Sequence, residues 1–594
     1  MEERSIYALF KKNCELYANR PAYRFKRDGR WHEITWRDHF QQCMVISKSL
    51  MALGVEKGDK VNILSQTRLE WVQCDFAIQN IGAVTVGIYP SSLAEDCAYI
   101  LNHSEANVLF VENREQLEKI LSVRSRLPHL KHIILFEGDV RDAEGVLNWD
   151  AFLQQGRGID DQSFEARAAD INLDDLAAIV YTSGTTGVPK GAMLTHENFL
   201  FTSWSILECL HSEEHFETLL FLPLAHAFAR MIVFCCMRAG YTLAFAESLE
   251  TIAENMAEIR PHFFASVPRI YEKVYERIHS RVADQGGLKK RLFDWAVAVG
   301  IQVSALKEKK QPIPAGLAWR YKIADLLVFK KIRQALGGRV VFTISGAAPL
   351  NVHIARFFHA CGILILEGLG MTENTSFTNV NRYDHYKFGT VGPPGPGIEQ
   401  KIAPDGEILF RGKNVMKGYY KNAEATAETI DEEGWLHTGD VGEILEDNFL
   451  RITDRKKDLI ITAGGKNIAP QRVERIIRTS RYISQVVAYG DRKKYLVALI
   501  TLDRPQVEAW AVKEGISYDG WEDLVQHPRV QELIQKEVDE RNRQLASFET
   551  IKRFLLIPED FSIESGELTP TLKLKRKAIF AKYHRQLEAL YTES

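Results

Sequence analysis

A segment rich in glycine and hydroxyl residues, YTSGTTGVPKG at 181–191, directly follows an apolar run. Its backbone N–H groups and hydroxyls can surround phosphate oxygens, and Lys190 adds a positive charge. Gly184 and Gly187 stand too close together for a Walker A loop, and Lys190 is not followed by the Ser or Thr that such a loop needs. The segment therefore predicts a nucleotide phosphate site unlike that of P-loop kinases and GTPases, although such a loop taken alone is more often a turn.

Six further segments carry charged, hydroxyl or glycine residues that could do chemistry. Each one alone has an ordinary structural role, such as a core histidine, a turn or a solvated basic face. A functional interpretation of these segments is favoured because they occur together with the segment 181–191. In chain order they are LPLAHAFAR (222–230), SGAAPL (345–350), EGLGMTE (367–373), WLHTGD (435–440), DRKKDLIITAGGKNIAP (454–470) and LTPTLKLKR (568–576).

The complete set, in this order, resembles the signature of the adenylate-forming superfamily, which includes acyl-CoA synthetases, luciferases and the adenylation domains of peptide synthetases. The resemblance runs over almost the whole chain. It implies a ligase that uses ATP, Mg²⁺ and coenzyme A to activate a carboxylic acid. Activation is necessary because the charge of a carboxylate repels nucleophiles and its oxygen is a poor leaving group.

The resemblance also assigns roles to single residues of this chain. Lys573 matches the catalytic lysine, Thr372 the contact to the α-phosphate, and His226 the position near the carboxylate pocket. Glu373 and Thr185 match the positions that help to hold Mg²⁺. The residues implied around ATP or AMP are Thr182, Ser183, Gly184, Thr185, Thr186, Gly187, Lys190, Gly346, Ala347, Ala348, Gly368, Leu369, Gly370, Met371, Asp440 and Arg455.

One matched segment departs from the family pattern, and another matches the hinge and the loop on the coenzyme A side. Leu369 stands where the family usually has an aromatic residue that stacks on adenine, so an aliphatic side chain would pack on the base here. Lys457 occupies the hinge position, and Gly464, Gly465 and Lys466 match the loop on the coenzyme A side.

The reaction implied by the resemblance has two halves. In the first, the carboxylate attacks the α-phosphorus of ATP to give acyl-AMP and pyrophosphate. Because two anions must approach each other, catalysis there is mostly positioning and charge neutralisation by Mg²⁺, the segment 181–191 and Lys573. In the second half a thiol attacks the acyl carbonyl, and rotation of a small C-terminal domain about the hinge withdraws Lys573.

The closest resemblance is to the long-chain fatty acid branch of the acyl-CoA synthetases. It rests on LPLAHAFAR, on SVPRIYEKVYERI (266–278), on a basic insertion at 287–333 and on GGKNIAP (464–470). We expect a fatty acid–CoA ligase, AMP-forming, for medium- to long-chain acids. Candidate residues for an apolar tunnel, which could equally be ordinary core, are Trp204, Phe221, Phe228 and Phe234.

Alternative functions stay open at this point. They are a fatty acyl-AMP ligase or acyl-carrier-protein synthetase, and a coenzyme A ligase for aromatic or short acids. The absence of an obvious extra stretch in 454–470 favours coenzyme A as the acceptor. A catalytically silent lipid-binding or scaffold protein would be expected to lack Lys573, Glu373 or Asp440, and all three are present.

Composition limits the classes of partner. The 594 residues include 75 Lys and Arg against 78 Asp and Glu, a net charge of −3, so we expect no nucleic-acid partner. The eight cysteines show no C-x-x-C spacing and predict reduced core residues. Without a secretory signal or an apolar run of membrane-spanning length, we expect a cytoplasmic protein. Peripheral contact with the inner face of a membrane and a homodimer stay open.

The elements that must position these residues form an α/β fold. Six short apolar runs between 107 and 368 alternate with helical patterns, which predicts layered, largely parallel sheets. We expect a large domain at 1–455 that binds AMP and the acyl group, and a small, mobile α+β domain at 456–594. The insertion 287–333 has 11 basic and 3 acidic residues and predicts a basic helical hairpin broken at Pro312 and Pro314. It is read as a solvated insertion, or as a site for an anionic membrane or a phosphorylated ligand.

Overall fold

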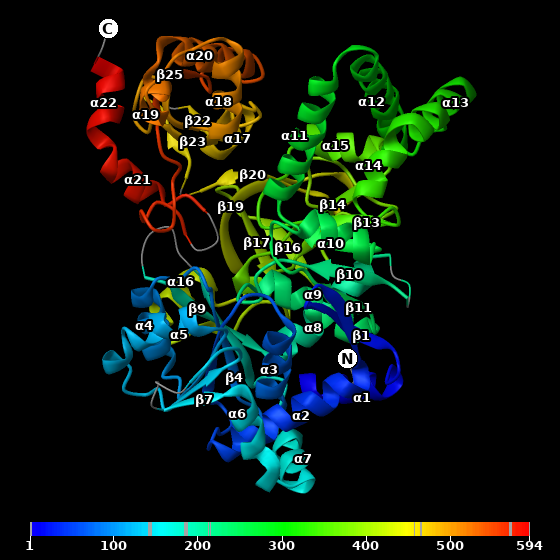
Figure 1. Ribbon diagram of the computed structural model, residues 1–594, viewed down its shortest axis with the longest axis vertical. Helices are drawn as coiled ribbons and strands as arrows, with labels where there is room; N and C mark the ends of the chain where they lie inside the picture. Colours follow the sequence, from blue (N-terminus) through cyan, green and yellow to red (C-terminus); the bar gives the residue numbers. More distant parts are fainter. Residues whose placement is uncertain are drawn as a thin grey trace.

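The computed structural model describes residues 3–140, 145–182, 188–211, 213, 215–456, 458–463, 466–569 and 573–592. The large N-terminal part contains two eight-stranded sheets, a four-stranded sheet and the helices that cover them, and the small C-terminal part lies at the top of Figure 1.

The first eight-stranded sheet is parallel except for one antiparallel pair at each edge. Its central strands are buried, as expected for a parallel sheet covered on both faces. In spatial order its strands are β15 (Asn379–Val380), β14 (Leu364–Leu369), β13 (Phe342–Ser345), β12 (Phe263–Ser266), β10 (Glu217–Leu220), β11 (Thr242–Phe245), β1 (Pro21–Arg27) and β2 (Arg30–Thr35).

The second eight-stranded sheet is parallel over six strands and antiparallel at one edge, where β8 pairs with β9 and β9 with β18. In spatial order its strands are β18 (Gly418–Tyr419), β9 (Lys190–Thr195), β8 (Leu176–Thr182), β4 (Val84–Ile88), β3 (Lys60–Leu64), β5 (Val108–Val111), β6 (His132–Leu135) and β7 (Val146–Asn148).

A third, antiparallel sheet lies before the small domain. Its strands are β16 (Glu399–Ile402), β17 (Glu407–Arg411), β19 (Leu436–Ile444) and β20 (Leu450–Arg455). The small domain has the pair β21 (Ile460–Ile461) and β22 (Asn467–Ile468), and a sheet of β23 (Ile483–Tyr489), β24 (Leu496–Leu502) and β25 (Ile551–Ile557).

Helices cover these sheets and begin at local capping residues. Thr35 and Asp38, for example, form a reciprocal capping box at the start of α2, and Gly240 ends α9 in the left-handed conformation. The helices of the large part are α1 (Ile6–Leu16), α2 (Trp36–Ala52), α3 (Leu69–Asn80), α4 (Ala94–Ser104), α5 (Arg114–Leu121), α6 (Trp149–Gln155), α7 (Asp161–Ala169), α8 (His196–Cys209), α9 (Ala227–Ala239), α10 (Ile252–Ile259), α11 (Pro268–Gln285), α12 (Gly287–Glu308), α13 (Ala315–Ala324), α14 (Lys330–Ala335), α15 (Val352–Ala360) and α16 (Ala423–Thr429). Those of the small domain are α17 (Pro470–Ile477), α18 (Arg504–Lys513), α19 (Trp521–Gln526), α20 (Pro528–Asn542), α21 (Arg576–Lys582) and α22 (His584–Thr592).

The sequence-based expectations for these elements are confirmed. All six predicted runs form strands, namely β5, β6, β8, β11, β13 and β14. The basic insertion is a helical hairpin of α12 and α13, and both prolines lie in the connection between the two helices. The eight cysteines are buried and none forms a disulfide. Within the described ranges, no helix is long and apolar enough to cross a membrane.

Buried apolar residues form separate cores in the two parts of the chain. The largest cluster extends from Ile6 to Leu450, whereas the clusters of the small domain begin at Ile460.

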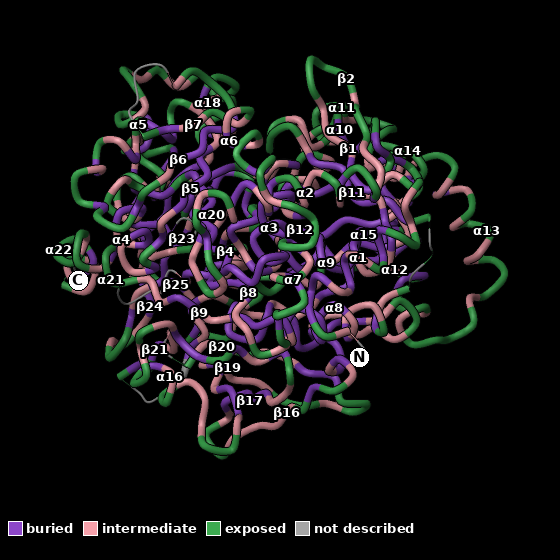
Figure 2. The backbone as a smooth tube through the Cα atoms, turned by 90° about the horizontal axis from the view of Figure 1, so that it is seen from below, coloured by how far each residue is buried: buried purple, intermediate pink, exposed green. Residues whose placement is uncertain are grey.

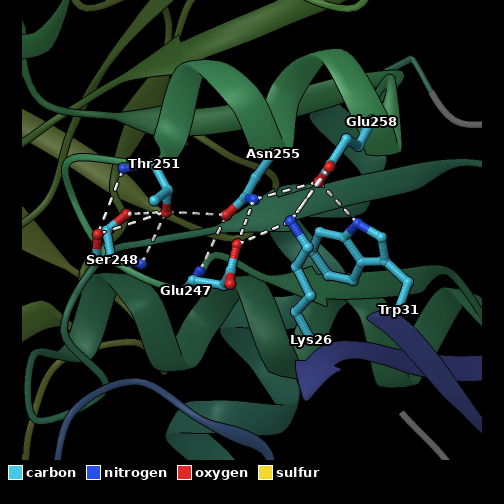
Figure 3. A network of polar contacts seen from close by, with 7 residues as sticks. All are labelled: Lys26, Trp31, Glu247, Ser248, Thr251, Asn255 and Glu258. Carbon is cyan, nitrogen blue, oxygen red and sulfur yellow. Dashed lines mark hydrogen bonds and ion pairs between the residues drawn. The ribbon is translucent and has the colours of Figure 1, made fainter. Parts of the chain in front are cut away.

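Polar contacts hold the edge of the first sheet against the rest of the large part. Lys26 on β1 contacts Glu247 and Glu258, and Trp31 on β2 donates to Glu258 (Figure 3). This network holds the β1–β2 hairpin against α10.

Candidate active site

The candidate site lies at the carboxyl ends of parallel strands, where loops of α/β proteins commonly bind ligands. Gly346 directly follows β13, the segment 368–370 ends β14, and Thr182 ends β8 of the other sheet. The resemblance had placed all of these residues around the nucleotide. The fold therefore brings together loops that are almost 200 residues apart in the sequence.

An apolar cavity runs from these loops into the large part of the protein. His226, Gly346 and Gly370 border it, and the empty space along its lining, about 890 Å³, includes space open to solvent. Phe263 on β12 and Phe342 on β13 are lining residues contributed by the sheet. Because nearly all of its lining is apolar, the cavity suits a hydrocarbon chain better than a polar ligand.

One helix supplies a regular stripe along this cavity. Phe228, Met231, Ile232 and Cys235 on α9 all line it, at the i, i+3, i+4, i+7 spacing of one helical face. Of the four residues that we considered for a tunnel, Phe228 lines the cavity. Phe234 instead packs in the core against two other phenylalanine rings.

His226 stands where the cavity begins and caps α9. Its Nδ1 atom accepts a hydrogen bond from the backbone N–H of Phe228 at 3.1 Å, so the proton of the neutral ring resides on Nε2. Burial, and to a smaller extent the charge of Lys573, lowers the pKa of His226 to about 4. The imidazole is therefore neutral at physiological pH and can donate a hydrogen bond from Nε2.

The glycines of the nucleotide loops allow the backbone to come close. A Cβ atom on Gly370 would overlap the backbone of Ser376, and one on Gly346 would contact the ring of Phe228 at 3.3 Å. Leu369 borders the cavity between the two glycines of its loop. Of the other predicted nucleotide contacts, Gly368 and Ala347 line the cavity, Met371 is half-buried, and Ala348 is exposed.

Thr372 and Glu373 lie in a short 3₁₀ turn that follows β14, and both are buried. The Glu373 carboxylate accepts a hydrogen bond of 2.7 Å from the hydroxyl of Tyr419 on β18. The same tyrosine ring lies 5.1 Å from the ammonium group of Lys190, which begins β9. Tyr419 thus connects two residues that the resemblance had placed on the phosphate side.

Asp440 and Arg455 face each other across the β19–β20 pair. The Arg455 Nε atom donates to the Asp440 carboxylate at 3.0 Å. Burial raises the pKa of Asp440, and the adjacent guanidinium opposes that rise. The pair presents a carboxylate that can accept hydrogen bonds beside a fixed positive charge.

Lys573 of the small domain joins this group from the opposite side. Part of its side chain remains exposed, yet the surrounding protein and the charge of Arg455 lower the pKa of its amine, while Glu373 and Asp440 oppose that shift. The backbone N–H of Thr569 donates to the backbone oxygen of Lys573 at 2.8 Å. The structure therefore gathers one histidine, two carboxylates and two cations around one site, and the roles that the resemblance assigns to them stay predictions.

Other predicted residues are not part of this group. Lys466 lies in the β21–β22 hairpin, and its ammonium group is 6.0 Å from the ring of Phe548 within the small domain. The Thr182 hydroxyl donates to the backbone oxygen of Lys190 at 3.3 Å. The predicted positions Ser183, Gly184, Thr185, Thr186, Gly187, Lys457, Gly464 and Gly465 lie outside the described residues.

Sequence reasoning missed Tyr419 and most of the cavity lining. The helical spacing of the stripe on α9 was visible in the sequence, but an apolar stripe of this kind is usually core. Nothing in the sequence around Tyr419 points to Glu373, which lies 46 residues away.

Two models of known protein families match this chain. The model of the AMP-binding enzyme family matches residues 10–420, and that of the AMP-binding enzyme C-terminal domain matches residues 457–594. The chain belongs to the AMP-binding enzyme family. The predicted superfamily is thereby confirmed.

Curated relatives of this AMP-binding enzyme carry specific names. The long-chain-fatty-acid–CoA ligase FadD15 of Mycobacterium tuberculosis is 37% identical over 580 residues, which cover 95% of this chain and 93% of the relative. The long-chain-fatty-acid–CoA ligase ACSBG2 of Homo sapiens is 32% identical over 618 residues, covering 99% and 92% of the two chains.

Solved structures share the fold of this AMP-binding enzyme. The anthranilate CoA ligase AuaEII in complex with anthranoyl-AMP superimposes with a TM-score of 0.72 at 21% identity, over 97% of each chain. The A-PCP didomain of a carboxylic acid reductase from Segniliparus rugosus, in complex with AMP, gives a TM-score of 0.76 at 21% identity, over 100% of this chain and 82% of that one. The expected architecture, a large α/β part followed by a small α+β part, is confirmed.

Proposed function

We propose that this protein is a long-chain-fatty-acid–CoA ligase that forms an acyl-AMP from ATP and a fatty acid and then transfers the acyl group to coenzyme A. The observation that carries the proposal is the apolar cavity that begins at His226, beside the gathered charged residues. The names of the two curated relatives support the same substrate class.

The depth of the cavity favours a long acid over a short or aromatic one. An α-helix rises about 1.5 Å per residue, so Cys235 lies roughly 13 Å beyond His226 along α9. An acetate or benzoate held at His226 would leave the part of the cavity near Cys235 unfilled. Each methylene that fills such space contributes about 0.8 kcal/mol.

We assign the first half-reaction to residues that surround the start of the cavity. The neutral His226 orients the fatty carboxylate, while Thr372 and the backbone at Gly370 hold the α-phosphate. Lys573 offsets the negative charge that accumulates when the two anions meet. Asp440 accepts hydrogen bonds from the ribose hydroxyls, and the other residues that the resemblance matches to ATP complete the site.

The residues present fit a magnesium ion that accompanies ATP. Mg²⁺ is usually held by one or two carboxylates together with substrate phosphates and water, and Glu373 offers one buried carboxylate on the phosphate side. The bound ion would neutralise phosphate charge. Tyr419 keeps the Glu373 carboxylate oriented for this purpose.

The second half-reaction requires a different arrangement of the small domain. We infer that Lys573, when it is at the site, blocks the approach of an incoming thiol to the acyl carbonyl. We propose that residues 456–594 rotate about Lys457 relative to residues 1–455, and that the loop with Gly464, Gly465 and Lys466 then borders the pantetheine arm. We propose that the ligase works in the cytoplasm.

Release of AMP across a series of acids tests the substrate and the acceptor. Acetate, benzoate, octanoate and palmitate are compared, each with and without coenzyme A. We expect turnover that depends on coenzyme A and is highest for palmitate. Single-turnover AMP formation that ignores coenzyme A would instead indicate an acyl-AMP ligase, and a maximum at acetate or benzoate would contradict the long-chain assignment.

A substitution separates the two half-reactions. Lys573→Ala should abolish adenylation, measured as pyrophosphate release, and leave thioester formation from supplied acyl-AMP largely intact. Lys577→Ala, an exposed lysine in the following helix, is the matched control. Equal loss of both half-reactions in the Lys573 variant would contradict the role given to this lysine.

A further inference from the structure

The second helix of the α12–α13 hairpin, together with the segment that follows it, has an exposed apolar surface. Helix α13, a π-helical turn at Asp325–Phe329 and α14 form one continuous helical segment. Its inner side is buried, with Ala324 and Phe329 both 0% exposed. On the outer side, Trp319 and Leu326 are each 66% exposed and Leu327 is 43% exposed. We call this outer side, from 319 to 331, the α13–α14 face.

Exposed apolar residues are concentrated in the insertion rather than scattered. The hairpin segment 287–333 holds five of the fifteen large apolar side chains that are exposed in the described chain, although it is a small fraction of the sequence. Scattered single residues are normal on a protein surface, whereas a group of this kind marks an interaction site.

Positive charges alternate with the apolar residues on the α13–α14 face. Arg320, Lys322, Lys330 and Lys331 are all exposed, and none forms an ion pair with any other described residue. Asp325 does not neutralise them, because it pairs with Arg333 at 2.5 Å. The face therefore combines a surplus of four positive charges with exposed side chains that water solvates poorly.

Helical spacing places both kinds of residue on the same side. Trp319, Lys322 and Leu326 are separated by three and four positions, so they form one row along the helix. Arg320 and Leu327 lie seven positions apart and form the adjacent row. Exposed Trp and Leu side chains next to Lys and Arg supply the two terms that attract a helix to anionic lipid, namely apolar area that can be buried and positive charge.

The α13–α14 face is accessible from outside the protein. In Figure 1, α13 extends away from the sheets at the upper right, and in Figure 2 it forms the right-hand edge with mostly exposed or half-buried residues. A flat bilayer can therefore reach α13 before it meets the bulk of the large part.

The same segment is connected to the acyl cavity. Four residues after α14, Arg339 donates to the carboxylate of Glu217 at 2.5 Å, at the start of β10. The preceding residue, Phe216, lines the cavity and stacks on His262. The chain that follows the α13–α14 face thus contacts the residue next to one that lines the cavity.

We infer that the α13–α14 face binds the surface of an anionic phospholipid bilayer, with Trp319, Leu326 and Leu327 entering the interface and the four basic residues contacting lipid phosphates. The net charge of the whole chain is −3, so the attraction comes from this local surface and not from the overall charge.

Sedimentation with vesicles tests the inference. Vesicles of phosphatidylcholine containing about one third phosphatidylserine are compared with pure phosphatidylcholine, at low and at high salt. We expect binding to the anionic vesicles only, and its loss at high salt. Failure of the unmodified protein to bind anionic vesicles at low salt, or equal binding to both compositions, would overturn the inference.

Substitutions locate the binding surface. Since each basic residue near an anionic membrane contributes about a fivefold gain in binding, Lys322→Gln with Lys330→Gln should lower the partition coefficient about thirtyfold. Trp319→Ala should also weaken binding while leaving the salt dependence in place. Lys513→Gln with Lys577→Gln, two exposed lysines of the small domain, is the matched control.

The outcomes distinguish bilayer binding by this face from binding by another surface of the protein or to another polyanion. Equal binding by the α13–α14 variant and the small-domain control would overturn the inference, as would retention on heparin without any binding to vesicles. Equal melting temperatures of the variants show that folding is retained. No fatty acid, ATP or coenzyme A is present in these measurements, so a negative result leaves the proposed function untouched.

Discussion

At the scale of single residues, Tyr419 holds the carboxylate of Glu373 in place. Its hydroxyl donates to Glu373 at 2.7 Å, and its ring lies below the ammonium group of Lys190. A hydrogen bond to a charged group contributes about 1.5–3 kcal/mol, and without it the buried carboxylate would have one partner fewer. Glu373 would then be oriented less well for the magnesium ion that we propose it helps to hold.

Tyr419→Phe should therefore reduce adenylation about tenfold or more. The apparent affinity for Mg²⁺ should fall more than that for the fatty acid, because the lost hydrogen bond acts on Glu373. Pyrophosphate release measured against magnesium concentration checks this prediction. Tyr420→Phe is the control at the adjacent position, and an unchanged magnesium dependence in the Tyr419 variant would contradict the proposed role.

Residues of the candidate site could be predicted where a local motif carries them. His226, Glu373, Asp440, Arg455 and Lys573 each lie in a segment whose neighbours are distinctive, and the structure brings their side chains together. Tyr419 could not be predicted, because its role arises only from the pairing of β18 with β9. Contacts made by sheet pairing leave no local pattern in the sequence.

At the scale of elements, α9 determines how far an acyl chain can extend. Its stripe of four residues runs from Phe228, next to the reacting end, to Cys235 further along the cavity. Because the stripe advances along the helix axis from position 228 to position 235, a bulky residue late in the stripe blocks only the later part of the cavity.

Cys235→Phe should shorten the range of accepted acids. We expect kcat/KM for palmitate to fall at least about tenfold, since overpacking typically costs about 1–3 kcal/mol, while octanoate is nearly unaffected. Cys235→Ala keeps the space open and should leave the chain-length profile unchanged. Parallel losses for both acids in the Cys235→Phe variant would show that α9 does not set the length.

An ion pair connects the two parts of the chain in this orientation. Arg478, at the end of α17, donates to the carboxylate of Glu272 on α11 at 3.0 Å. Burial lowers the pKa of Arg478, and Glu272 supplies the first opposing charge. The ion pair forms in the same orientation of the small domain in which Lys573 reaches the site.

Glu272→Gln should destabilise the orientation of the small domain in which Lys573 reaches the site, relative to its other orientations. Loss of a partly exposed ion pair corresponds to roughly 1 kcal/mol, so adenylation should slow about fivefold. Thioester formation from supplied acyl-AMP should be unchanged or faster. Lys273→Gln alters an exposed charge on the same helix and is the control. Equal slowing of both half-reactions would argue against a contact specific to one arrangement.

Strands with continuous apolar runs were predicted from the sequence more readily than half-exposed ones. The strands β5, β6 and β8 are buried along almost their whole length and form continuous apolar runs, which single sequences reveal. Strands β16 and β20 are half-exposed and have no such run, so the third sheet was not predicted. The basic hairpin was visible because of its charge.

At the scale of the whole molecule, buried histidines make stability depend on pH. Burial lowers the pKa of His39 to about 3 and that of His196 to about 4. An unfolded histidine has a pKa of about 6.5, so between these values the unfolded chain binds more protons than the folded one. The contribution of these histidines to stability is therefore complete above about pH 6.5 and falls as the pH drops toward about 4.

His39→Phe should flatten this dependence. Each such histidine contributes up to about 1.4 kcal/mol per pH unit within the window, and removing one should reduce the decrease of the melting temperature between about pH 6.5 and 4. The melting temperature followed by circular dichroism checks this expectation. His129→Gln, an exposed histidine, is the control, and identical slopes in both variants would contradict the role given to His39.

The fold-back of the small domain was implied by the sequence only through the resemblance. Lys573 follows the segment 181–191 by almost 400 residues, and nothing local in that distance shows that the two meet. The structure places the lysine close enough to Glu373 and Asp440 for their charges to affect its pKa. Long-range placement of this kind follows from the packing of whole domains.

The cavity is part of the main core, and this affects the lifetime of the protein. Phe216, Met231 and Phe342 line the cavity and also belong to the largest apolar cluster. A fatty acid that fills the cavity therefore completes the interior of the protein and, by mass action, stabilises it against unfolding. When the supply of fatty acids falls, more of the molecules carry an incomplete interior and become easier to degrade. The substrate would then regulate the abundance of the enzyme as well as its rate.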